Sequence, residues 1–194
     1  MSVYQHSVPG TAERSSGQLL CDACCYCLGQ CLEVVQGLPD PVYSRSAAGS
    51  SAIGVHVRHI IERVLCVLEG METGQVDYDC RARQRLLEES PAAALRALES
   101  LKARLAMLPT EANIPLQARE SVHPEVQPVA IASTLNRELM SLISHTTHHL
   151  ALISLLARSR GIELAAEIGK APSTLIHERE EGNRDRQVPD SEPG

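Results

Sequence analysis

Apolar residues recur every three or four positions in four separate segments of the chain. This spacing puts them on one face of an amphipathic helix, the face that packs against a core. The periodicity predicts four helices, over residues 12–36, 51–69, 91–108 and 135–160. Since each helix buries one stripe only, the pattern favours helices packed on helices.

Start and stop residues support these boundaries. Gly37 follows the first segment and Gly70 follows the second, where a glycine commonly ends a helix. Ser90 stands before a proline at the start of the third segment, and Ser133 or Thr134 can cap the fourth. We therefore expect an all-α fold, a four-helix bundle.

The connection between the third and fourth helices is long and unlike the others. Residues 109–132 contain four prolines, which a helix interior does not accommodate. Alternating apolar and polar residues over 114–118 and 126–131 permit a short β-hairpin in this segment. A link of this length predicts a crossover connection rather than a simple up-and-down turn.

The two ends of the chain lack the helical pattern. Residues 1–11 read as a flexible N-terminal tail, and residues 179–194 are charged and predicted to be a disordered C-terminal tail. The segment between them, 12–178, is expected to form one domain. A second polar loop is predicted over 71–89, within which Asp77, Tyr78 and Asp79 fit turn chemistry.

Composition narrows the class further. Tryptophan and phenylalanine are absent and aromatic residues make up 2% of the chain, so the core must come from aliphatic residues and cysteine. The formal net charge is -6 and no basic stripe stands out, which argues against a nucleic acid or an anionic membrane surface as partner. No uninterrupted apolar run reaches the ~20 residues of a membrane span, and the polar start is not a secretory signal. A cytoplasmic location is therefore expected.

Histidines carry the main chemical signal. His145 and His149 lie four residues apart in the fourth helix, which puts their Cβ atoms about 5–6 Å apart on one face. His56 and His59 lie in the second helix. Two imidazoles from one helix and a third from another form a three-ligand site for a divalent metal, with open positions for chemistry. The alternative is that these are ordinary core histidines held by hydrogen bonds.

Several stretches resemble one family. The strings SSAIGVHVRHIIERV and VDYDCRAR, with SHTTHHLALISLLARSRGIEL and GKAPSTLIHE, are similar to the DinB-like (DinB/YfiT-type) superfamily of damage-inducible and thiol-dependent proteins. The likeness extends over roughly residues 15–178. It departs from many members at Leu150-Ala151-Leu152, where they carry Arg-Gly-Gln.

The resemblance implies a four-helix bundle with zinc or nickel at one end, bound by His59, His145 and His149. His56, one turn earlier, competes with His59 as the helix-two ligand. His56 or Glu62 would be the catalytic proton carrier, although a solvated helix face also explains Glu62. The resemblance further implies a homodimer, a small-molecule substrate and a low-molecular-weight thiol as cosubstrate. Thiol-dependent transfer, isomerisation or hydrolysis would be the reaction.

Two other functions remain open at this stage. The chain could be a non-catalytic metal-binding or stress-response module, or a metal-free helical interaction protein.

Cysteines form the second chemical signal. Five of the seven lie in the first predicted helix, and Cys21 and Cys24 have the CxxC spacing of redox and zinc sites. However, Cys24, Cys27 and Cys31 follow the apolar periodicity of that helix, and no second CxxC exists. We therefore expect reduced cysteines that act as small core residues, with thiol redox chemistry at Cys21 and Cys24 as the alternative. Arg58 and Arg63 are expected to pair with Glu62 or Glu69, or to bind an anionic substrate.

Overall fold

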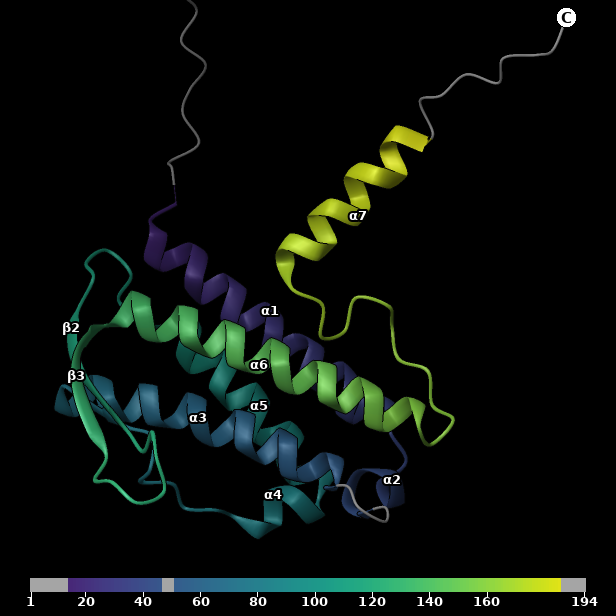
Figure 1. Ribbon diagram of the computed structural model, residues 1–194, viewed down its shortest axis with the longest axis horizontal. Helices are drawn as coiled ribbons and strands as arrows, with labels where there is room; N and C mark the ends of the chain where they lie inside the picture. Colours follow the sequence, from purple (N-terminus) through teal and green to yellow (C-terminus); the bar gives the residue numbers. More distant parts are fainter. Residues whose placement is uncertain (1–13, 47–50, 186–194) are drawn as a thin grey trace, which may run out of the picture.

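The computed structural model describes residues 14–46 and 51–185. The part of the chain that it describes is mostly helical and carries one small three-stranded sheet (Figure 1). The all-α prediction is therefore right for most of the fold, and the sheet enlarges the short hairpin that the sequence permitted.

Four long helices correspond to the four periodic segments: α1 (Ser16–Gly37), α3 (Ile53–Thr73), α5 (Pro91–Ala106) and α6 (Leu135–Arg158). Three of them begin at capping side chains, because Ser15, Ser90 and Thr134 each accept a hydrogen bond from a backbone N–H in the first turn. Each long helix packs against two others: α1 against α5 and α6, and α3 against α5 and α6 (Figure 1). Their aliphatic faces form the core between them.

The expected end of the second helix at Gly70 is wrong. Helix α3 continues to Thr73 and ends at Gly74, which has φ 76° and so adopts the left-handed conformation that favours glycine. Gly70 has a different role. A Cβ atom there would lie 2.6 Å from Cγ2 of Val76, so the glycine lets the next segment pass close to the helix.

The predicted hairpin is present. Strands β2 (Pro115–Glu120) and β3 (Val129–Thr134) pair antiparallel, with Ala118 opposite Ile131. A third strand, β1 (Gln75–Asp77), pairs parallel with β2 directly after α3. Its three residues are too short for an alternation pattern to reveal, so the sequence did not predict it. The sheet lies beside the C-terminal part of α3 and the start of α6 (Figure 1).

Three shorter helices complete the fold: α2 (Asp40–Ser44), α4 (Arg85–Glu89) and α7 (Pro172–Asp185). Helix α4 lies inside the predicted polar loop 71–89. Helix α7 points away from the other helices in Figure 1 and differs from the expected unstructured tail over 179–185. The remainder of that tail and the N-terminal tail 1–11 lie outside the described residues.

Helices α1 and α6 are long and apolar enough to cross a membrane by length and composition, each with mean hydropathy 1.2. This corrects the expectation that no segment qualifies, which counted only uninterrupted apolar runs. Both helices supply residues to the core, and a core helix of a soluble protein passes the same test. The finding is weak evidence for a membrane.

Candidate metal centre

Three histidines from two helices meet on the seam between α3 and α6. The ring centroids of His59 and His145 are 4.8 Å apart, those of His59 and His149 are 4.8 Å apart, and those of His145 and His149 are 4.5 Å apart. One nitrogen from each ring lies within 4.8 Å of the others. The residues predicted as metal ligands are thus brought together, at a spacing that one ion could bridge.

The helical repeat explains the arrangement. His145 and His149 are one turn apart, so both rings leave α6 on the face that α3 covers. Their neighbours Leu142, Leu150 and Ile153 are buried, which orients this face toward the core. The histidines themselves are half-buried. They therefore lie at the margin of the core.

The donor set fits a metal ion. Nε2 of His145 is buried and has no hydrogen-bond partner among the described residues, a costly state for a polar atom that ligation would relieve. Burial lowers the pKa of His145 to about 3, with Arg63 adding to the effect. Burial also lowers the pKa of His149 to about 4, followed by the influence of His59. The rings are neutral near pH 7, which is the form that ligates a metal.

His59 has an additional neighbour. Nη1 of Arg81, from the loop after β1, lies 2.5 Å from Nδ1 of His59. Burial and then the Arg81 charge lower the pKa of His59 to about 4. Because a guanidinium only donates, Nδ1 is the acceptor and this neutral ring carries its proton on Nε2.

His56 lies beside the three-histidine cluster and contacts His149. Its Nδ1 lies 3.0 Å from Nδ1 of His149, so one of these two nitrogens donates to the other. If His149 donates, its Nε2 lone pair is free toward His59 and His145, and His56 orients the ring as an outer partner does in metal sites. The geometry therefore favours His59 over His56 as the helix-two ligand. His148 is exposed, with its ring centroid 5.3 Å from that of His149.

Glu62 faces a different set of groups. Its Oε2 pairs with Arg58 at 2.7 Å and its Oε1 accepts the backbone N–H of Gln84 at 3.0 Å. Arg58 also pairs with Glu88. The expected ion pair between Arg58 and Glu62 is thus confirmed, but Glu62 is buried and does not lie on a solvated helix face. The expected pairing of Arg63 with Glu62 or Glu69 is wrong, because Arg63 pairs with Glu120. Within the described residues Glu62 makes no hydrogen bond to a histidine, so its contacts favour holding the loop before α4 over carrying protons.

A polar network adjoins the cluster on the sheet side, and the sequence did not reveal it. Tyr78 and Ser133 both donate to the buried carboxylate of Glu138. Arg63 stacks on the Tyr78 ring, with its Cζ 3.8 Å from the centroid, and pairs with Glu120 at 2.6 Å. These side chains line a cavity of about 320 Å³. The sequence contained one signal for this network: Glu138 is an acidic residue at a position that the helical period places on a buried face.

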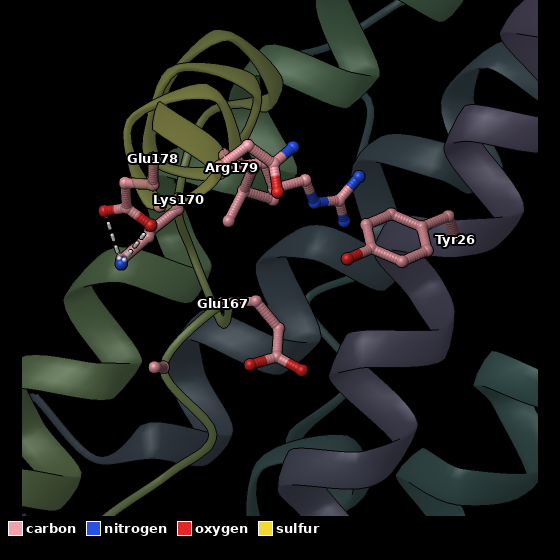
Figure 2. A pocket seen from close by; sticks show the side chains of 9 residues that line it. Tyr26, Glu167, Lys170, Glu178 and Arg179 are labelled. Carbon is pink, nitrogen blue, oxygen red and sulfur yellow. Dashed lines mark hydrogen bonds and ion pairs between the residues drawn. The ribbon is translucent and has the colours of Figure 1, made fainter. Parts of the chain in front are cut away.

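Another cavity lies away from the histidines. It measures about 660 Å³ and is lined by Tyr26 of α1, by residues 166–170 and by α7. Figure 2 shows Tyr26, Arg179 and the ion pair between Lys170 and Glu178 around it. No histidine of the cluster is among the residues that line this cavity.

The cysteines of α1 do not form a comparable site. All seven cysteines of the chain are free thiols, and the four at positions 21, 24, 27 and 31 are buried. Burial raises the pKa of the Cys24 and Cys31 thiols far above the ordinary thiol range. A thiol held protonated is a poor nucleophile and a poor ligand. The prediction that Cys24, Cys27 and Cys31 are core residues is therefore confirmed.

A comparison of this chain with protein-family models, curated proteins and solved structures finds no match.

Proposed function

We propose that this chain is a DinB-like divalent-metal-binding protein and a metal-dependent enzyme that acts on a small molecule. The observation that carries the proposal is the convergence of His59, His145 and His149, each able to offer a neutral ring nitrogen within 4.8 Å of the others. Three imidazoles favour zinc or nickel, which are borderline metals.

The architecture supports the same proposal. We infer that α1, α3, α5 and α6 form a four-helix bundle of the DinB type, because each packs against two of the others. The long connection between α5 and α6 carries the hairpin that the sequence permitted. A homodimer, a small-molecule substrate and a cytoplasmic location are part of this proposal.

Three protein ligands favour catalysis over a structural role, because a structural zinc is usually closed by four. The bound metal would lower the pKa of a thiol or water, which then acts as a nucleophile near neutral pH. In this mechanism His59, His145 and His149 hold the ion, and His56 accepts a hydrogen bond from Nδ1 of His149.

Metal analysis of the protein purified without a histidine tag tests the first step. We expect about one equivalent of zinc or nickel per chain, retained through gel filtration and restored after chelation. His145→Gln should lose it, whereas His123→Gln, a change in an exposed loop, should retain it. Less than about half an equivalent after reconstitution would contradict the proposal and leave a helical interaction protein.

The choice between an enzyme and a non-catalytic module depends on the open position. In the cobalt(II) form, an added small thiol should produce a sulfur-to-cobalt charge-transfer band if a position is exchangeable. A cobalt spectrum that thiols, azide and cyanide all leave unchanged would favour the closed, non-catalytic module.

A further inference from the structure

The side chain of Arg81 enters the histidine cluster without an acidic partner. Its Nη1 donates to Nδ1 of His59 at 2.5 Å, and its Nε is buried with no hydrogen-bond partner within residues 14–46 and 51–185. The other two arginines near the cluster are neutralised: Arg58 by Glu62 and Glu88, and Arg63 by Glu120. In the part of the chain that the structure describes, Arg81 makes no ion pair. A half-buried guanidinium without a carboxylate partner costs free energy, which is unusual in a folded protein.

Metal ligation by His59 would release Arg81. A neutral imidazole has one lone pair and one N–H. If Nε2 ligates, the proton resides on Nδ1, which can no longer accept from Arg81. If Nδ1 ligates, its lone pair is used and Arg81 is displaced. In both cases the Arg81 guanidinium loses its present partner and remains beside a site of positive charge.

We propose that Arg81 binds a carboxylate on the substrate or cosubstrate, next to the metal. This inference rests on the proposed function, since it requires His59 to be a ligand. An arginine fork matches a carboxylate, and a single negative charge balances the one unpaired guanidinium. Arg81 also lines a cavity of about 290 Å³ together with Glu62 and Glu69, and none of the three histidines is among the residues that line it. The contact of Arg81 with His59, and not this cavity, therefore places the carboxylate next to the metal.

A matched pair of thiols tests this with the wild-type protein in the cobalt(II) form. Mercaptopropionate and mercaptopropanol have chains of similar length, and only the first carries a carboxylate. We expect mercaptopropionate to bind about tenfold or more tightly by the charge-transfer band, the value of one charge-assisted hydrogen bond. The preference should shrink at high salt.

Two variants assign the effect to Arg81. Arg81→Gln should bind cobalt at least as tightly as the wild type does, because it removes a group that competes for Nδ1 of His59. It should still bind mercaptopropanol but lose the preference for mercaptopropionate, and Arg81→Lys should retain part of that preference. Arg83→Gln removes a charge from an exposed position of the same loop and should keep the full preference. Cobalt stoichiometry and thermal unfolding are measured for each variant.

The outcomes separate the two proposals. If cobalt binds and the two thiols have equal affinity, or if Arg81→Gln keeps the preference, the carboxylate inference is wrong and the metal site stands. If cobalt does not bind at all, both are overturned, because Arg81 then keeps His59 as its partner.

Discussion

Helix α1 and the seam between α3 and α6 both carry residues of the kinds that bind metals, and among the described residues only the seam brings three of them to a spacing that one ion could bridge. Five cysteines lie on α1 within eleven residues, and four of them are buried with their thiols held protonated. Cys24 donates weakly to the backbone oxygen of Leu139, which satisfies it. The three clustered histidines are half-buried, and in the part of the chain that the structure describes the buried Nε2 of His145 has no hydrogen-bond partner.

The difference shows that density of ligand residues along a chain is a poor guide to a metal site. Residues four apart on one helix share a face, as Cys27 and Cys31 do, but a third ligand atom reaches such a pair when another element supplies it. His59 comes from α3 and meets the α6 pair because the two helices pack together. A site needs convergence from different elements, and access from solvent.

The largest expected effect comes from replacing one histidine of the seam, with one cysteine of α1 replaced for comparison. His149→Ala should weaken zinc affinity at least about a hundredfold, because two ring nitrogens remain where three were available. Cys24→Ala should leave the affinity unchanged. Competition with a chromophoric chelator measures both. A loss of affinity in Cys24→Ala would mean that α1 supplies a ligand.

The free energy of unfolding should show the opposite order: replacing a cysteine of α1 should lower it more than replacing a histidine of the seam. Cys31→Ser places a hydroxyl where a fully buried thiol now lies, and we expect a loss of about 2 kcal/mol in the free energy of unfolding. His145→Leu, measured without metal, should be close to neutral or stabilising, since it removes a buried nitrogen that lacks a partner. Urea titration of both variants gives the comparison. A large loss in His145→Leu would show that the ring is needed for packing.

His56 offers a smaller change at the margin of the seam. His56→Leu removes the partner of His149 Nδ1, and we expect zinc affinity to fall about tenfold, as for other outer partners of metal ligands. His56→Gln, whose amide oxygen can accept the same hydrogen bond, should recover most of the loss. His148→Leu is the matched control on the exposed side. Equal losses in all three variants would exclude an orienting role.

A last effect concerns the acid stability of the metal-free protein. The folded-state pKa values of His59, His145 and His149 are about 4, 3 and 4, below the ordinary 6.5. The unfolded chain therefore binds more protons, so the free energy of unfolding falls as the pH is lowered from about 6.5 toward 4. Replacing all three histidines by glutamine should flatten this slope in urea titrations between pH 6.5 and 5. An unchanged slope would assign the acid sensitivity to other groups.

Local sequence patterns account for much of the molecule. The 3.6-residue period located the four long helices, and the alternation after the prolines located the β2–β3 hairpin, because both follow from which side of a regular backbone meets the core. The spacing of His145 and His149 placed them on one face before any tertiary contact was known. For the third ligand, on α3, the sequence left two candidates, His56 and His59.

Long-range packing decided the rest. That His59 joins the cluster while His56 lies beside it depends on how α3 is rotated against α6, and periodicity does not record this rotation. Strand β1 pairs with β2, whose residues lie about 40 positions later in the chain, and its Val76 passes close to Gly70 of α3. Arg81 reaches His59 across 22 positions of sequence because the loop after β1 folds back on α3. Such contacts join residues that are far apart in the sequence, and no local sequence pattern predicts them. Only the tertiary structure therefore reveals them.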